Sequence, residues 1–349
     1  MLALLTACSM STASATVRSE ALGAALHGAP RLGLGMASLG RPGYINLGHA
    51  DDLPTERTVE AMRLHAHDVL DEAYNLGLRY IDCARSYGMS EEFVASWLAK
   101  RPEVAADVVI GSKWGYEYTA DWRVQVGEGE AHEVKKHTVA QFTSQLEETR
   151  ALLKDRLALY QIHSATEESG VLTADDVLDA LAAKLRDAGV AAGASVSHPQ
   201  ATPLELATAA ARGDKPLFAS VQATFNLLDQ SAAPQLKAAH ESGLFVIIKE
   251  ALANGRLTSR APDPNVKAVL AAEAERLGTT ADAVSLAWVL SHEWVSMVLS
   301  GASSVEMLRA NADALRITPL PADVMERLGA AIGQPLDEYW SDRKALAWN

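Results

Sequence analysis

Four residues of the types used in proton transfer stand at or just after the ends of short apolar runs. Asp82 ends one such run, and Tyr87 follows it in a short turn that contains Gly and Ser. Lys113 and His163 end two later runs. In parallel α/β folds the carboxyl ends of the strands meet at the rim where chemistry is done. We therefore expect these four side chains to converge and to form the catalytic group.

The chemistry that this group suggests is protonation of an oxyanion. An unperturbed tyrosine has a pKa of about 10, and a nearby ammonium lowers that pKa and makes the phenol a better acid at neutral pH. Lys113 supplies the ammonium, and Asp82 is the carboxylate that keeps it charged in a partly buried site. His163 donates a hydrogen bond that orients a carbonyl oxygen beside Tyr87. Such a pocket suits the addition of hydride from a cofactor to a C=O group.

The strands that must position these residues are short and alternate with amphipathic helical patterns. Continuous apolar strands of this kind indicate a parallel sheet that is buried on both faces. Eight strands close a (β/α)8 barrel of about this length. The predicted fold is therefore α/β, a (β/α)8 TIM barrel in one domain over residues 31–349, with a C-terminal helix and tail. We expect its strands at residues 31–39, 78–83, 107–114, 157–163, 191–196, 217–222, 244–249 and 295–300.

The two ends of the chain lie outside this alternation. Residues 1–30 are rich in Ala, Ser and Thr, and we expect them to form a disordered leader. The run ending at Cys8 resembles a lipoprotein cleavage box, but the residues before it contain no Lys or Arg and are fewer than a signal peptide needs. The tail carries Trp340 and Trp348, which either fold over the barrel mouth or cover its outside.

Composition narrows the class of protein. The 349 residues include 48% hydrophobic and 21% charged residues, as in an ordinary globular enzyme. A net charge of −13 argues against nucleic acid or an anionic membrane as the main partner. Two cysteines, Cys8 and Cys83, support neither a disulfide framework nor a cysteine zinc site, and they favour a cytoplasmic location. We also expect no membrane span, because the sequence has no run of apolar residues long enough to cross a bilayer. We expect no metal site, since His132 and His137 lack the spacing of a helical zinc motif.

The segments around the four candidate residues resemble the aldo-keto reductase family. The similar segments are Ile81–Glu91, Ile110–Gly115, Leu159–His163, Val221–Leu228, Lys249–Leu257 and Gly301–Ser304 with Leu308 and Asn311. Together they extend over about residues 31–315. The resemblance implies an oxidoreductase in which Tyr87 is the acid, Lys113 and Asp82 tune it, and His163 orients the substrate.

The resemblance also implies NADP(H) or NAD(H) as the cofactor. The positions that it assigns to cofactor binding are Met36, Asp82, Ser195, Gln222, Leu252, Gly301, Ser303 and Asn311. The substrate it implies is a small aldehyde, ketone or sugar. Trp114 and Trp122 lie around the loop after the third strand, where they either wall the substrate pocket or cover the barrel, and we favour the pocket.

The sequence departs from the family pattern near the expected nicotinamide. Val196 stands where the family usually has an Asn, and Lys249 or Glu250 stands where an aromatic residue is common. No Lys or Arg occurs in Gly301–Met307, where the family often binds the 2′-phosphate, and only Arg309 is close. The choice between NADP(H) and NAD(H) therefore stays open.

Two other functions fit parts of the pattern. A Schiff-base lyase on the same barrel would use Lys113 or Lys249 as its nucleophile, and it would not require Tyr87. A regulatory subunit that binds the cofactor and turns over slowly would keep the same residues. The sequence does not identify the substrate, the direction of the reaction or the oligomeric state.

Overall fold

Eight parallel strands close into a barrel in the computed structural model, which describes residues 13–349. Around the barrel the strands follow the order β1-β12-β11-β10-β7-β6-β3-β2, and β2 pairs with β1 to close it. The barrel strands are β1 (Leu32–Gly35), β2 (Tyr80–Asp82), β3 (Val109–Trp114), β6 (Leu157–Ala165), β7 (Ala191–Val196), β10 (Ser220–Thr224), β11 (Phe245–Lys249) and β12 (Met297–Ser300). Each lies within or overlaps a strand expected from the sequence, and the (β/α)8 fold is confirmed.

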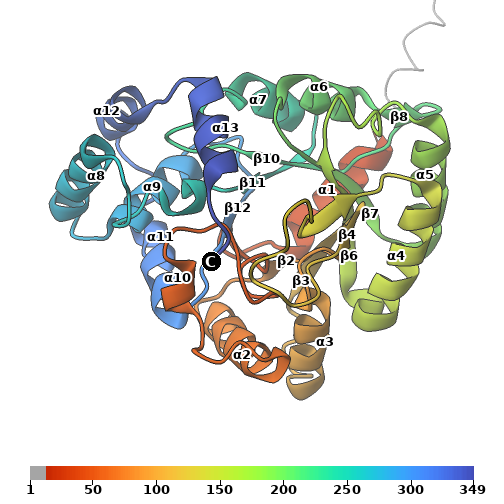
Figure 1. Ribbon diagram of the computed structural model, residues 1–349. Coiled ribbons are helices and arrows are strands. Elements are labelled where there is room, and N and C mark those ends of the chain that lie inside the picture. The colour runs from red at the N-terminus through yellow and green to blue at the C-terminus, as the bar shows by residue number, and fades with distance from the viewer. Residues whose placement is uncertain (1–12) are drawn as a thin grey trace, which may run out of the picture.

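Helices surround the barrel, as Figure 1 shows. They are α2 (Val59–Asn75), α3 (Ser90–Lys100), α4 (Val139–Leu153), α5 (Asp175–Ala188), α6 (Ala201–Ala209), α7 (Ala233–Glu241), α8 (Pro264–Leu277), α9 (Ala281–Leu290), α10 (Val305–Ala312), α11 (Ala314–Ile317) and α12 (Ala322–Ile332). Side-chain oxygens of Thr58, Thr138 and Ser304 cap the first turns of α2, α4 and α10. Within residues 13–349, no helix combines the length and the apolar character needed to cross a bilayer.

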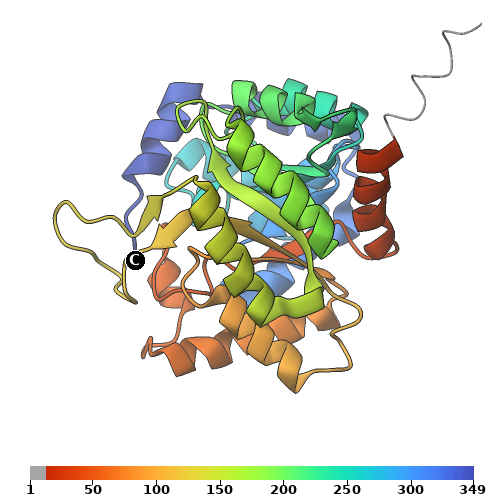
Figure 2. The same ribbon diagram turned by 90° about the vertical axis from the view of Figure 1, so that its right-hand side faces the viewer.

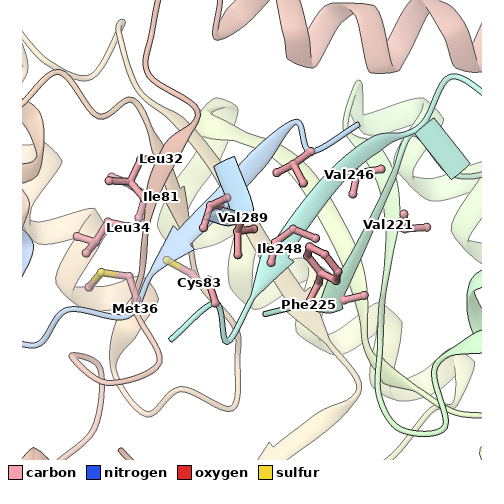
Figure 3. Close-up of a cluster of buried hydrophobic side chains, with 14 of the residues drawn as sticks. Leu32, Leu34, Met36, Ile81, Cys83, Val221, Phe225, Val246, Ile248 and Val289 are labelled. Atoms are coloured by element: carbon pink, nitrogen blue, oxygen red, sulfur yellow. The ribbon is translucent and has the colours of Figure 1, made fainter. Parts of the chain in front are cut away.

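The alternation of side chains along the strands divides the core into two layers. One layer lies between the strands and the helices and includes Ile81 and Ile248, which Figure 3 shows among its neighbours. The other lies inside the barrel and includes Tyr80, Leu159 and Ile247. Because successive side chains of a strand point to opposite faces, every second residue of each strand points into the barrel. This alternation decides which polar residues reach the barrel mouth.

A helix that the sequence did not predict closes the bottom of the barrel. The expected disordered leader is wrong over Ala13–Ala25, which form α1. Leu22 and Leu26, one turn apart, are buried against the layer inside the barrel. Figure 2 shows α1 at one end of the molecule and the C-terminus at the other. Residues 1–12, which include Cys8, lie outside the described part of the chain.

The opposite end, the mouth, carries further elements that the sequence did not predict. The loop after β3 contains a hairpin of β4 (Tyr116–Tyr118) and β5 (Glu133–Lys135). The tail forms α13 (Leu336–Ala345). Its last residue, Asn349, pairs with Tyr44 through two backbone hydrogen bonds of 3.1 and 3.2 Å. A second small pair, β8 (Ala211–Arg212) and β9 (Lys215–Pro216), lies outside the barrel sheet and contacts α1 at the bottom rather than the mouth.

Candidate active site

The structure brings the four candidate catalytic side chains together at the mouth. Asp82, Lys113 and His163 occupy inward positions near the carboxyl ends of β2, β3 and β6, and Tyr87 comes from the loop after β2. Lys113 Nζ donates hydrogen bonds to the carboxylate of Asp82 and, at 3.4 Å, to Tyr87 Oη. Tyr87 Oη lies 3.3 Å from His163 Nε2. Two nitrogens thus flank one phenol oxygen at the wall of a cavity.

Asp82 is the centre of a buried hydrogen-bond network below this phenol. Its Oδ2 accepts from Gln222 Nε2 at 2.9 Å, from Tyr80 Oη at 3.3 Å and from Gln161 Nε2 at 3.5 Å. Its Oδ1 accepts from Lys113, and both side chains of this ion pair are almost fully buried. A buried ion pair is tolerated only when its remaining hydrogen-bonding groups are satisfied. The network therefore holds the Lys113 ammonium in one position.

Tyr87 is a protonated phenol in the free protein. Its pKa lies well above the ordinary value, first because burial disfavours the phenolate and then because the Asp82 carboxylate is near. The sequence led us to expect the opposite direction, with Lys113 lowering this pKa. The expectation was wrong because the charge of Lys113 is offset by Asp82, with which it is paired. A raised pKa keeps the proton on Tyr87 until a stronger base forms beside it.

His163 is a neutral imidazole. Burial lowers its pKa well below the ordinary value, and the charge of Lys113 lowers it further. Its Nδ1 lies 3.3 Å from Ser86 Oγ, and His137 Nε2 lies 2.9 Å from its backbone oxygen. In the tautomer in which Ser86 donates to Nδ1, Nε2 carries the hydrogen and can donate to an oxygen beside Tyr87.

A cavity of about 440 Å³ opens above these groups. It extends from Tyr87 and His163 to Gly301 and Asn311, beyond β12. Seven of the residues predicted to be catalytic or to bind the cofactor line it, namely Asp82, Tyr87, His163, Gln222, Leu252, Gly301 and Asn311. Lys113 lies beneath the lining, in contact with Tyr87.

Three residues predicted to bind a cofactor do not line this cavity. Met36 lies beside Leu34 in the layer between strands and helices (Figure 3). Ser303 is buried, and its Oγ donates to Met307 Sδ at 3.6 Å. Ser195 is buried at the end of β7, where its Oγ accepts a hydrogen bond from Lys249 at 3.3 Å. Ser195 therefore reaches the cavity only through Lys249, which lines it.

The predicted role of two tryptophans in the substrate pocket does not hold. Trp114 is fully buried and packs against Phe142, with 5.0 Å between the ring centroids. Because Lys113 points into the barrel, the next residue of the strand must point to the helices. Trp122 packs against Phe93 and donates to the carbonyl oxygen of Arg57 at 2.7 Å. Neither tryptophan is part of the cavity wall.

The roof of the cavity comes from Trp348, for which the sequence left a place over the mouth open, and from Arg41, which the sequence did not assign to the site. The tail places Trp348 over the mouth. Its ring stacks on that of His132 with 3.7 Å between the ring centroids, and the guanidinium carbon of Arg41 lies 4.7 Å from the centroid of the Trp348 ring. Arg41 also covers the ring of Tyr87 at 5.2 Å and forms an ion pair with Glu133 at 3.2 Å. The aromatic residues of the tail could have assigned Trp348 to the site from the sequence, whereas Arg41 belongs to no motif and could not have been found in this way. Trp340, the other tail tryptophan, stacks on His198 away from the cavity lining.

A second ion pair ties the tail helix to the end of β11. Arg343 of α13 binds Glu250 through two nitrogens, with Nε 2.8 Å from Oε2 and Nη2 2.5 Å from Oε1. The charge of Arg343 lowers the pKa of Glu250 against the raising effect of burial, which is the largest influence. Both residues line the cavity. Glu250 therefore faces the cavity as a carboxylate that already has its cation.

The far end of the cavity offers hydrogen-bond acceptors without a partner. Oδ1 of Asn311 and Oδ1 of Asn254 are buried and accept no hydrogen bond from the described residues. At Gly301 no described side chain or neighbouring atom comes within 4 Å of the position that a Cβ would take, so the backbone there is open to a ligand. Amide oxygens and an open backbone suit the amino and hydroxyl groups of a nucleotide, so these residues fit the implied cofactor. Among residues 13–349, no cluster of three or more His, Cys, Asp or Glu is arranged to hold a metal ion.

Comparisons with known proteins agree with this geometry. A sequence model described as the aldo/keto reductase family matches residues 31–332. YqkF of Bacillus subtilis, an uncharacterized oxidoreductase, is 25% identical over 278 residues, which cover 72% of this chain and 84% of that protein. YrpG of the same organism, also an uncharacterized oxidoreductase, is 24% identical over 311 residues, which cover 81% and 90% of the two chains.

The fold is also similar to that of a solved structure. The holo form of an aldo-keto reductase from Bacillus halodurans superposes with a TM-score of 0.64 and 20% sequence identity. The match covers 88% of this chain and 95% of that one. At this identity the similarity is evidence for the fold alone, whereas the family match covers all eight strands of the barrel.

Proposed function

Because the chain belongs to the aldo/keto reductase family and is an oxidoreductase, we propose that it transfers a hydride between a nicotinamide cofactor and a small carbonyl compound or alcohol. The cofactor is NADP(H) or NAD(H), and the substrate is an aldehyde, ketone or sugar. One observation carries the proposal. Tyr87 Oη stands between Lys113 Nζ at 3.4 Å and His163 Nε2 at 3.3 Å, at the wall of a cavity.

In this proposal the substrate oxygen binds beside both Tyr87 Oη and His163 Nε2. A bound reduced nicotinamide supplies the hydride that reaches the substrate carbon. As negative charge develops on the oxygen, Tyr87 donates its proton to it. Lys113 stabilises the resulting phenolate through its hydrogen bond to Oη, and Asp82 keeps that ammonium charged and in place. Trp348 and Arg41 exclude water from above.

The cofactor would be held by residues along the cavity. In the proposal Gln222 binds the nicotinamide end, the backbone around Leu252 the pyrophosphate, and Gly301 and Asn311 the adenosine end. The unpartnered amide oxygen of Asn311 and the open backbone at Gly301 support this assignment. Arg309 forms an ion pair with Glu72 at 2.7 Å. With its charge already satisfied, Arg309 gives no support for a 2′-phosphate site.

The lyase alternative receives less support. A Schiff-base lysine needs a free amine, but Lys113 Nζ donates to Asp82, to the backbone oxygen of Cys83 and to Tyr87. Lys249, the other candidate nucleophile, lines the cavity with a pKa lowered by burial to about 8, so its hydrogen bonds do not argue against a lyase. The family match favours hydride transfer, and the complete set of four residues favours turnover over a purely regulatory role.

The test is a fluorescence titration of the protein with NADPH and, separately, with NADH. We expect at least one of them to bind with a micromolar dissociation constant and then to be oxidised when an aldehyde is added. If neither binds at that level, the proposed hydride transfer is wrong.

A further inference from the structure

Two lysines that line the cavity, Lys249 and the exposed Lys344 of α13, form no ion pair with a carboxylate of residues 13–349, and Lys249 is the one at the end of a barrel strand. Lys249 ends β11, points into the barrel and lines the cavity. Its Nζ donates one hydrogen bond, to Ser195 Oγ at 3.3 Å, and no carboxylate among residues 13–349 forms an ion pair with it. Lys113, on the opposite side of the barrel, is fully engaged by comparison. Two hydrogens of the Lys249 ammonium are therefore left for a ligand in the cavity.

The surrounding charges cancel in pairs and leave that of Lys249. On β3 and β2, Lys113 is paired with Asp82, and on α13 Arg343 is paired with Glu250. From the hairpin, Glu133 offsets Arg41. His163 of β6 is neutral, because its pKa lies well below the ordinary value. The inner cavity thus carries about one unit of positive charge, which is located on Lys249, while the second unpaired lysine, Lys344, is exposed to solvent on α13.

The two forms of a nicotinamide ring differ by one unit of charge, because the oxidised ring is a cation and the reduced ring is neutral. A ring that passes hydride to a carbon beside Tyr87 and His163 must lie in this same cavity. We propose that Lys249 makes the site select the reduced form of its nicotinamide cofactor over the oxidised form. The inference rests on the proposed function and deepens it, since it predicts that the site holds the reduced cofactor and releases the oxidised cofactor readily.

The selection depends on pH, because Lys249 has an unusual pKa. Burial is the main cause that lowers its pKa to about 8. Glu250 and Asp82 act in the raising direction, whereas Arg343 and Lys113 act in the lowering direction. Lys249 is therefore charged below about pH 8 and neutral above it. The preference for the reduced form should be strong in mild acid and should fade in alkali.

The test measures binding and needs no turnover. Calorimetric dissociation constants for NADH, NAD⁺, NADPH and NADP⁺ would be compared at pH 6.5 and pH 9.5 for the wild type, Lys249→Met and Lys249→Arg. At pH 6.5 we expect Lys249→Met to bind the oxidised forms about tenfold to a hundredfold better relative to the reduced forms, as expected for two charges a few ångströms apart in a partly buried site. Lys249→Arg should keep the preference at both pH values, whereas the wild type should lose most of it at pH 9.5.

Each outcome separates the inference from the proposed function. If the wild type binds the cofactors but Lys249→Met leaves the ratio unchanged, or weakens both forms equally, the selection by charge is wrong and the proposed function stands. If the wild type binds no nicotinamide cofactor, the proposed function fails and this inference fails with it.

Discussion

The two ends of the barrel are closed by opposite kinds of contact. At the bottom, α1 and the turn that follows it insert Leu22 and Leu26 into the apolar layer inside the barrel. At the mouth, α13 and the tail are held by the buried ring of Tyr339, by an ion pair between Arg343 and Glu250 and by hydrogen bonds of Asn349. The bottom closure excludes water from apolar surface, whereas the mouth closure joins charged and polar groups around a cavity.

Because of this difference, the bottom of the barrel contributes to stability and the mouth contributes to function. Burial of leucines is favourable whether or not a ligand is present, so the bottom contributes to folding alone. Polar contacts exchange with water at little net cost, so the mouth can reorganise around a ligand. Substitutions at the mouth should therefore change activity or local order, and substitutions at the bottom should change global stability.

The largest effect is expected for Tyr87→Phe at the mouth. The variant keeps the ring and loses only the proton donor, so kcat should fall about 10³-fold, within the range for removal of a general acid. The melting temperature and the affinity for the cofactor should stay close to those of the wild type. Steady-state kinetics, together with the cofactor titration, measure both. An unchanged kcat would remove Tyr87 from the catalytic role.

At the bottom, Leu22→Ala should destabilise the fold without a change in chemistry. Leu22 is 4% exposed, and removal of a buried leucine side chain lowers the free energy of unfolding by about 3 kcal/mol. The matched control is Leu64→Ala, because Leu64 is 49% exposed on α2. Urea unfolding of both variants, with kcat measured under native conditions, gives the comparison. Equal stability of the two variants would mean that α1 does not close the barrel in solution.

The smallest effect is expected for Arg343→Gln in α13. Loss of the ion pair with Glu250 should raise hydrogen exchange of the amides in Leu336–Ala345 by about tenfold, since charge-assisted hydrogen bonds contribute roughly 1.5 kcal/mol or more. The global unfolding midpoint should hardly move. Arg316→Gln is the control, because Arg316 is exposed in its ion pair with Asp313. Unchanged exchange in α13 would contradict a polar closure of the mouth.

The same ion pair predicts how acid acts on the mouth. The pKa of Glu250 is lower in the folded protein than its ordinary value, so its stabilising contribution is present above the ordinary pKa and is lost as the pH falls through the lowered one. In Arg343→Gln this acid sensitivity of α13 should largely disappear. Exchange rates corrected for intrinsic pH effects, compared between the two proteins, measure it.

The barrel was predictable because each of its strands can be recognised from its own short stretch of sequence. Each strand is a short apolar run, and several helices begin at a capping residue such as Thr58 or Thr138. Helix α1 was missed because its sequence is rich in small residues and because Leu22 and Leu26 pack on a surface that exists only after the strands have closed. The hairpin β4–β5 and helix α13 were missed for the same reason, since contacts at the mouth stabilise them.

The position of the candidate residues was predictable from strand ends, and some errors could have been avoided. The alternation of side chains that turns Lys113 inward also turns Trp114 outward, and this follows from their adjacency in the sequence. The direction of the Tyr87 pKa was not readable in this way. It depends on burial and on Asp82, which become known only from the packed site.

The placement of α1 decides how the protein should be attached to a surface. Figure 2 shows α1 at the end of the molecule opposite the C-terminus. A linker joined on the N-terminal side of α1 would leave the mouth facing away from a support and open to solution. A linker at the other end would extend from Asn349, whose Nδ2 donates to the backbone oxygen of Asn46 at 2.9 Å beside the cavity. For a sensor or an immobilised catalyst, attachment through the N-terminal end is the better design.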